Sequence, residues 1–329
     1  MINTLKMLNS VRQIIKLSKP ARNFAKGKFS LPILMQVQSV SACNGSCIFC
    51  PYPFTHKELP QGKMDWETYK SIVDECVTFP TLQMFTPMLQ NEPLIDRDLC
   101  KAIRYFREKS AGRIPVFIIT NGYLLTSNMV KELVDSGLDH LIISINAFKK
   151  ETYAELMPGF ELEKLIVNIE NLLKSDLRKT KVTLRFLETE KNKKEIVEAL
   201  QYWKNRKVRT EILSFISNRA DTVDISNLKA KESDLLFSTK IKKKTFSVFS
   251  KCCILPFYQM NILFNGDVLI CCNDWRRNPV LGNVKKQKLS DIWFGEKANI
   301  VRESILKKNY KIIAACKGCS MTDYFESWR

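Results

Sequence analysis

Residues 41–51 read Ser-Ala-Cys-Asn-Gly-Ser-Cys-Ile-Phe-Cys-Pro, and they decide how the rest of the chain is interpreted. Their three cysteines, Cys43, Cys47 and Cys50, stand in a C-x3-C-x2-C spacing on a glycine-containing loop that follows an apolar, strand-like run. A single zinc ion would need a fourth nearby Cys or His, and the only candidate, His56, lies beyond a Pro-Tyr-Pro segment. A cubane iron–sulfur cluster accepts three thiolates and can leave one iron open. The spacing therefore favours a cluster, with a zinc knuckle or three unrelated buried cysteines as the alternatives.

This spacing, together with the aromatic Phe49 before the last cysteine, resembles the signature of the radical S-adenosylmethionine (SAM) superfamily. The resemblance implies that Cys43, Cys47 and Cys50 bind a [4Fe–4S] cluster whose open iron holds the amino and carboxylate groups of SAM. It places Phe49 near the SAM adenine. It also implies reductive cleavage of SAM to a 5′-deoxyadenosyl radical, which removes a hydrogen atom from a substrate, with electrons from an external donor such as flavodoxin or ferredoxin.

Length and composition are those of an ordinary globular protein. The chain has 329 residues, of which 45% are hydrophobic and 26% charged, and one barrel-like domain with a smaller appendage fits this length. No stretch approaches the roughly 20 apolar residues of a membrane span, and the N-terminus lacks the apolar core of a secretory signal. We therefore expect a cytoplasmic protein. Eleven cysteines in that reducing compartment indicate metal ligation rather than disulfides.

The net charge of +18 has several possible meanings: nucleic-acid binding, an anionic membrane surface, an anionic small substrate, or lysines scattered over solvated faces. Basic clusters at 191–194 and 242–244 are not interleaved with aromatic residues, so we expect no specific nucleic-acid partner. Residues 1–28 have the spacing of a basic amphipathic helix that ends at Pro20. Such a helix either packs against the main domain or makes peripheral contact with a membrane.

Between residues 29 and 221, strand-like and helix-like runs alternate six times. The expected strands are Ile33–Val40, Leu82–Leu89, Val116–Thr120, His140–Ile145, Val182–Leu187 and Thr210–Phe215, and the expected helices are 66–78, 96–109, 126–136, 150–155, 162–174 and 192–205. Such repeats predict an α/β fold with a parallel sheet and right-handed crossovers. With the cysteine loop after the first strand, the pattern resembles the partial (β/α)6 TIM-like barrel of the radical SAM superfamily. In such barrels the chemistry lies at the carboxyl ends of the strands.

Polar residues stand at the predicted ends of the second, third and fourth strands. Gln90-Asn91-Glu92-Pro93 follows the second strand, where the superfamily usually has Gly-Gly-Glu-Pro, and the resemblance implies that Asn91 and Glu92 hold the SAM amino group. Asn121 belongs to a Thr-Asn-Gly turn like that of the superfamily, and Ser144 stands where relatives place a serine near the SAM ribose. Two residues later, Asn146 replaces the acid common in relatives.

Two arginines complete the expected barrel site. Arg185, in the fifth strand, occupies the place of a polar residue that in many relatives meets the SAM carboxylate. An inward arginine needs an anionic partner, and the alternative is a side chain that faces out between the helices. Arg219 follows the sixth strand, and at the barrel mouth it could bind a carboxylate, phosphate or hydroxyl of a substrate.

A second unit is expected at 250–329, after a polar, lysine-rich linker at 222–249. It contains two strands, Phe257–Phe264 and Val268–Ile270, joined by Asn265-Gly266, which is a hairpin turn signal. The cysteines of this unit are spaced Cys253-x12-Gly-x4-Cys271, followed at a distance by Cys316-x2-Cys319.

Four thiolates make a complete ligand set for a metal centre. A structural zinc ribbon also uses four cysteines. The spacing resembles the twitch domain, a shortened relative of the SPASM domain, with a β-hairpin and a helix, and this implies one auxiliary [4Fe–4S] cluster. Cys252 and Cys272 are spare in that assignment, and Cys76 and Cys100 fall in helical stretches as packed thiols.

The leading hypothesis is a radical SAM oxidoreductase that removes hydrogen from a small polar metabolite such as a sugar, cyclitol or nucleoside, with the auxiliary cluster as electron acceptor. The cysteine plan is similar to that of the radical SAM dehydrogenases of aminoglycoside biosynthesis, and related twitch enzymes are dehydratases or epimerases. The alternatives are a SPASM-type maturase of a ribosomally synthesised peptide and a non-enzymatic zinc protein that binds nucleic acid. The sequence assigns no catalytic residue and no particular substrate.

Overall fold

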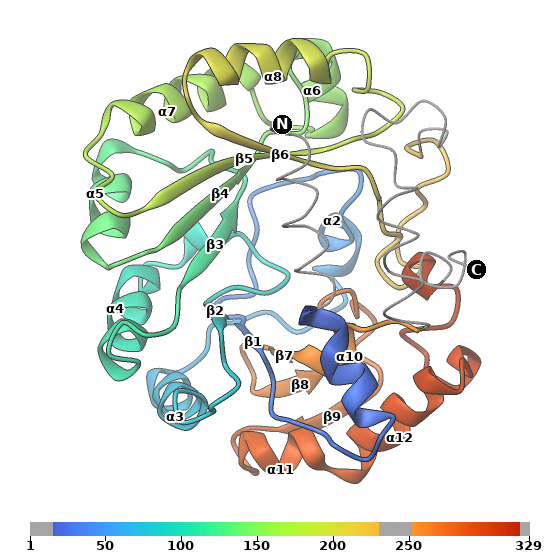
Figure 1. Ribbon diagram of the computed structural model, residues 1–329. Coiled ribbons are helices and arrows are strands. Elements are labelled where there is room, and N and C mark those ends of the chain that lie inside the picture. Colours follow the sequence, from blue (N-terminus) through green and yellow to red (C-terminus); the bar gives the residue numbers. More distant parts are fainter. Residues whose placement is uncertain (1–15, 230–251, 323–329) are drawn as a thin grey trace.

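The structure is a computed structural model that describes residues 16–229 and 252–322 (Figure 1). The six predicted strands and the six predicted helices are all present; two of the helices follow the fourth strand, and none lies between the sixth strand and residue 229. The strands are β1 (Leu34–Val37), β2 (Met84–Thr86), β3 (Phe117–Thr120), β4 (His140–Ser144), β5 (Lys181–Leu187) and β6 (Arg209–Leu213). The helices between them are α3 (Trp66–Cys76), α4 (Leu99–Lys109), α5 (Ser127–Asp135), α6 (Lys150–Leu156), α7 (Leu162–Lys174) and α8 (Ile196–Asn205), with the short α2 (Tyr52–Thr55) and the 3-10 turn η1 (Pro93–Ile95) in the loops. The predicted partial barrel is confirmed.

The parallel strands form one curved wall in two hydrogen-bonded parts. Strands β1 and β2 pair in parallel, β3 to β6 pair in parallel and in chain order, and a single bridge between Phe85 and Val116 links the two parts. In Figure 1 the helices α3, α4, α5, α7 and α8 lie outside this wall, whereas the short α2 lies on its inner side. All six strands therefore end at the same edge of the barrel, where the loops meet.

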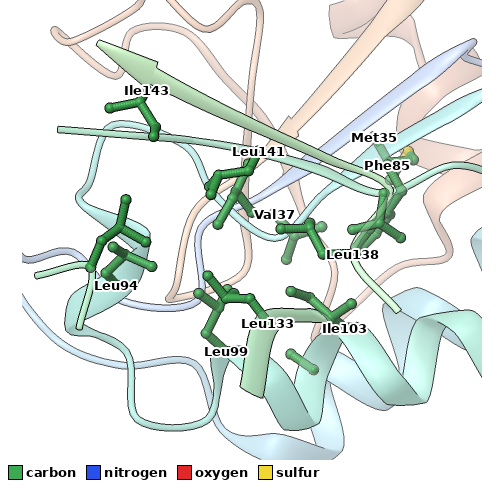
Figure 2. Close-up of a cluster of buried hydrophobic side chains, with 14 of the residues drawn as sticks. Met35, Val37, Phe85, Leu94, Leu99, Ile103, Leu133, Leu138, Leu141 and Ile143 are labelled. Atoms are coloured by element: carbon green, nitrogen blue, oxygen red, sulfur yellow. The ribbon is translucent and has the colours of Figure 1, made fainter. Parts of the chain in front are cut away.

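Register decides which side chains face the helices and which face the barrel interior. Met35 lies opposite Phe85, whose ring stacks on that of Phe106 of α4 at 3.8 Å, so this side of β1 and β2 is the apolar core. Figure 2 shows part of this core, including Met35, Phe85 and Ile103. Because side chains alternate along a strand, Gln36 and its neighbour Thr86 face the interior. The core thus positions a polar interior wall.

The C-terminal unit continues the barrel wall. Its elements are α10 (Leu255–Tyr258), β7 (Gln259–Ile262), β8 (Asp267–Leu269), β9 (Val280–Asn283), α11 (Leu289–Phe294), α12 (Glu296–Leu306) and the 3-10 turn η3 (Tyr310–Ile312). The predicted hairpin is β7 and β8, but β7 also pairs in parallel with β1, which the sequence did not predict. Glu75 of α3 accepts the backbone N–H groups of Leu289 and Ser290 at the start of α11, at 2.9 and 3.0 Å. Strand β7 thus covers what would otherwise be an edge at β1, and the two units form one body.

The described parts of the two flanking segments pack on this body. Residues 16–24 are helical, so the predicted end of the helix at Pro20 is wrong, and the Phe24 ring contacts that of Phe257 at 5.5 Å. Residues 1–15 lie outside the described residues. From the predicted linker, Val223, Ile225 and Leu228 are buried in the main core, and residues 230–251 are not described. Within the described ranges, no helix combines the length and apolarity needed to cross a membrane.

Candidate functional site

The loop between β1 and α2 gathers the first three cysteines. Burial raises the pKa of the Cys43 thiol to about 12, and the negative charges of Glu92 and Cys50 add to the rise. Burial also raises the pKa of Cys47, and there Cys50 and Cys43 contribute. The thiols of this one short loop therefore oppose one another's ionisation. Buried thiols of this kind fit a group that supplies metal cations, since thiolates are the ligand form.

Across 16–229 and 252–322, no group of three or more His, Cys, Asp or Glu side chains meets the geometry of a site for a single metal ion. A cubane cluster spreads its thiolate ligands over several iron atoms, so its cysteines stand further apart than those around one ion. The backbone N–H of Gly45 donates to the Cys43 sulfur at 3.4 Å, which holds the loop in shape. Phe49 is half-buried and packs against the main core beside this loop.

Glu92 is a buried acid in the loop after β2, with 3% of its surface exposed. Its carboxylate accepts hydrogen bonds from the Thr120 hydroxyl at 2.6 Å, from the Leu94 backbone N–H at 3.1 Å and from the Asn121 backbone N–H at 2.9 Å. Burial raises the pKa of Glu92 to about 7, although these bonds act in the opposite direction. Glu92 therefore ties the end of β2 to the end of β3. Asn91 lies beside it, and its side-chain oxygen accepts the N–H of Leu89 at 2.8 Å.

The turn after β3 connects this acid to the cysteine loop. The side-chain amide of Asn121 donates to the Asn44 side-chain oxygen at 2.8 Å, and Asn44 lies between the first two cysteines. Gly122 follows with a φ of 74°, and a Cβ there would lie 2.7 Å from Leu165 and 2.8 Å from Ile143. The tight Asn-Gly turn thus needs glycine for both conformation and space.

Inside the barrel, the ends of β4, β5 and β6 carry one polar row. Ser144, Arg185 and Glu211 occupy matching positions on these strands. The Arg185 guanidinium donates through Nε at 3.0 Å and Nη2 at 2.9 Å to one oxygen of Glu211. Because the opposite face of β5 carries the buried Leu184 and packs on the helices, Arg185 faces inward, which is one of the two orientations that the sequence left open. Its anionic partner Glu211 was not predicted, and only the strand register reveals it.

Asn146, which stands where relatives have an acid, is a structural residue in this chain. It adopts a φ of 52° and is 4% exposed. Its side-chain oxygen accepts the N–H of Leu187 at 3.1 Å, and its backbone oxygen accepts from the side-chain amide of Asn192 at 2.5 Å. These bonds join the loops after β4 and β5.

The second cysteine set converges from distant parts of the C-terminal unit. Burial raises the pKa of Cys253, with added opposition from Cys316 and Cys319. Burial also raises the pKa of Cys271, and the negative charges of its neighbours add to the rise; these are Cys272, Asp274, Cys316 and Cys253. Burial raises the pKa of Cys316 to about 12. The predicted four cysteines are therefore brought together, and each is less than 10% exposed.

The neighbours of this set occupy distinct places. Cys271 packs with Cys253 and Cys316 in one apolar cluster, whereas Cys272 packs against Leu89 and Leu263 in another. Cys271 and Cys272 thus pack in different clusters, which supports Cys271 in the set. Cys76 and Cys100 lie in the main core on α3 and α4.

The loop after β6 lies between the two sets of cysteines. Arg219 donates through Nη1 to the side-chain oxygen of Asn273 at 2.9 Å. Burial raises the pKa of Cys50, and the positive charge of Arg219 acts in the opposite direction. Asn218 donates through its side chain to the Gly318 oxygen at 2.7 Å. Residues 219–221 all have φ between 51° and 60°, an unusual left-handed run for residues other than glycine.

The profile of the radical SAM superfamily matches residues 37–203, and that of SPASM, an iron–sulfur cluster-binding domain, matches residues 252–320. An S-adenosyl-L-methionine-dependent 2-deoxy-scyllo-inosamine dehydrogenase from Niallia circulans is 22% identical over 87% of this chain and 92% of its own length.

Solved structures show the same fold. The crystal structure of BtrN in complex with AdoMet and 2-DOIA has a TM-score of 0.61 and 19% identity over 88% of this chain and 93% of that one. SuiB of Streptococcus suis bound to precursor peptide SuiA has a TM-score of 0.69 and 17% identity over 90% of this chain and 73% of that one.

These matches confirm the expected cofactors: SAM and a [4Fe–4S] cluster at the first domain, and auxiliary iron–sulfur binding at the second. The chain is an enzyme that belongs to the radical SAM superfamily and carries a C-terminal SPASM iron–sulfur cluster-binding domain.

Proposed function

We propose that this enzyme is a radical SAM oxidoreductase that oxidises a small polar metabolite, with a cyclitol or sugar as the leading substrate class and a nucleoside as a further member. The observation that carries the proposal is the convergence of Cys253, Cys271, Cys316 and Cys319 into one buried set beside the barrel mouth. A fully ligated auxiliary cluster has no open iron, so its natural role is electron transfer. The name of the dehydrogenase from Niallia circulans, matched over most of its length, supports the substrate class.

The residues around the two sites have separate proposed roles. Cys43, Cys47 and Cys50 hold the first cluster, and the four C-terminal cysteines hold one auxiliary cluster. The proposed surroundings of SAM are Phe49, Asn91, Glu92, Asn121, Ser144 and Arg185. When bound, SAM and the first cluster would supply a radical that abstracts hydrogen, and the auxiliary cluster would accept the electron left on the substrate.

The chain's own side chains orient the reactants. Glu92 fixes the turns after β2 and β3, because its two carboxylate oxygens bind groups from both. The ion pair of Arg185 and Glu211 is 21% and 38% exposed at its side chains, so it offers donors and an acceptor to hydroxyl or amino groups within the barrel. Arg219, between Asn273 and the cysteine loop, is the candidate for substrate contact at the mouth.

Several further parts of the proposal concern the setting of the enzyme. Reduced thiols and clusters favour the cytosol, where an external donor such as flavodoxin or ferredoxin supplies electrons. Peripheral membrane contact through residues 1–28 stays a separate part of the proposal, and residues 17, 21 and 24 of that segment pack on the C-terminal unit. No observation favours the peptide maturase or the zinc protein over the oxidoreductase.

The experiment is anaerobic reconstitution followed by reduction and incubation with SAM and single candidates: 2-deoxy-scyllo-inosamine, other aminocyclitols, sugars and nucleosides. We expect one class to lose two hydrogens in step with the appearance of 5′-deoxyadenosine. Oxidation of a short peptide instead, with no turnover of any of these metabolites, would contradict the proposal. A matched Cys316→Ala/Cys319→Ala protein should cleave SAM without forming the oxidised product.

A further inference from the structure

Gln90 has a backbone conformation that its side chain does not favour. Its φ is 55°, in the left-handed region. Gln90 stands where the Gly-Gly-Glu-Pro motif of the superfamily has its first glycine. A residue other than glycine at such an angle is strained and persists only when its surroundings fix it. Contacts of the Gln90 side chain must therefore compensate.

Those contacts cross from the barrel to the C-terminal unit. The side-chain amide of Gln90 donates to the backbone oxygen of Asp274 at 2.9 Å and to that of Cys272 at 3.3 Å. A side-chain amide has two N–H groups, and both are used by this one loop. From the other side, the Gln38 side chain donates to the Gln90 backbone oxygen at 3.4 Å. The backbone of Gln90 is thus held by Gln38, just after β1. Its side chain is held by Cys272 and Asp274, which are 182 and 184 positions further along the chain.

The loop that Gln90 holds is the one that follows Cys271. Asn273, in the middle of it, accepts the bond from Arg219 described above, so residues 272–274 are gripped from two sides. Asp274 is fully buried there, and its Oδ2 has no hydrogen-bond partner within the ranges that the structure describes. At the other end of the contact, Glu92 lies two residues after Gln90. The amide therefore links the turn proposed for SAM directly to the loop of an auxiliary ligand.

We propose that Gln90 is a positioning residue that locks the loop 271–274 against the Glu92 turn and so fixes the separation between the two metal sites. The inference rests on the proposed function for the presence of both clusters. A glycine at this position would adopt the same backbone angle without strain but would leave the loop oxygens without their donor. Compared with glycine, glutamine at this position therefore adds the side-chain bonds to the loop and does not change the turn conformation.

The test compares Gln90→Gly and Gln90→Glu with the wild type. Gln201→Glu is the matched control, because Gln201 is an exposed residue of α8 whose side-chain amide donates to its helix neighbour Asn205 at 3.1 Å. Amide hydrogen exchange of residues 271–275 is followed in the reconstituted protein. We expect both Gln90 variants to exchange there roughly tenfold faster, the factor that about one hydrogen bond is worth. Gln201→Glu should match the wild type.

A second readout is the magnetic coupling between the two reduced clusters by electron paramagnetic resonance. Wild type should show one defined coupling, and both Gln90 variants a weakened or broadened one at unchanged iron content and melting temperature. Unchanged exchange and unchanged coupling in both variants would overturn the role of Gln90. A wild type that lacks auxiliary iron would overturn the proposed function instead, and the exchange data would still decide whether Gln90 holds the loop.

Discussion

Replacement of Glu92 by glutamine tests whether a buried acid at the barrel mouth limits stability at neutral pH. Burial raises the pKa of this carboxyl from 4.5 to about 7, so the folded protein binds its proton more tightly than the unfolded chain does. Stability must then fall as pH rises from the unfolded value through the folded one. The neutral side chain of Glu92→Gln removes this dependence.

The magnitude follows from the two pKa values. A full shift from 4.5 to about 7 corresponds to roughly 3 kcal/mol against the ionised form, and about 2.5 kcal/mol of it develops between about pH 5 and pH 8. The variant also places an N–H group against the backbone N–H of Asn121, which costs roughly 1–3 kcal/mol at every pH. That constant cost cancels when the difference between wild type and variant is compared at two pH values.

The assay is urea unfolding of the cluster-free protein, followed by intrinsic fluorescence at about pH 5 and pH 8. From the lower to the higher pH, Glu92→Gln should gain about 2.5 kcal/mol relative to wild type. Glu198→Gln, an exposed change on α8, serves as the control and should show almost no such gain. A difference between Glu92→Gln and wild type that stays constant across this range would refute the reasoning.

Three further changes have definite expected outcomes. Gly122→Ala should lower the free energy of unfolding by roughly 2–4 kcal/mol in urea titrations, because it combines an unfavourable φ with contacts under 3 Å; equal stability would mean that the turn adapts. Arg302→Met should lower the free energy of unfolding by roughly 2–4 kcal/mol in the same titrations, because the guanidinium donates to the backbone oxygens of Pro256 at 3.0 Å and Trp293 at 2.6 Å inside the core. An unchanged free energy would mean that these two bonds do not stabilise the fold. Cys316→Ala/Cys319→Ala should about halve the iron content and leave SAM cleavage in place; an unchanged iron content would remove these cysteines from the ligand set.

Much of the barrel could be predicted because its signals are local. The strand–helix alternation is predicted from side-chain periodicity, and the loop of Cys43 to Cys50 is predicted from cysteine spacing within a few residues. The hairpin turn at Asn265-Gly266 also predicts that Cys253 and Cys271 approach each other, since they flank its strands.

The contacts that the sequence did not reveal all join distant parts of the chain. The pairing of β7 with β1 brings Gln36 to Asn261, 225 positions away, with a side-chain bond of 2.7 Å. Glu211 faces Arg185 only because β5 and β6 adopt one particular register. At Gln90 the sequence showed the loss of a glycine, but its reach to the loop after Cys271 depends on how the C-terminal unit docks. Local patterns contain no information about such docking.

The most direct test of the account is the iron and acid-labile sulfide content of anaerobically reconstituted protein, measured together with its zinc content. Two [4Fe–4S] clusters predict about eight iron and eight sulfide per chain with almost no zinc. One or two zinc ions per chain in a colourless protein without iron would contradict the account.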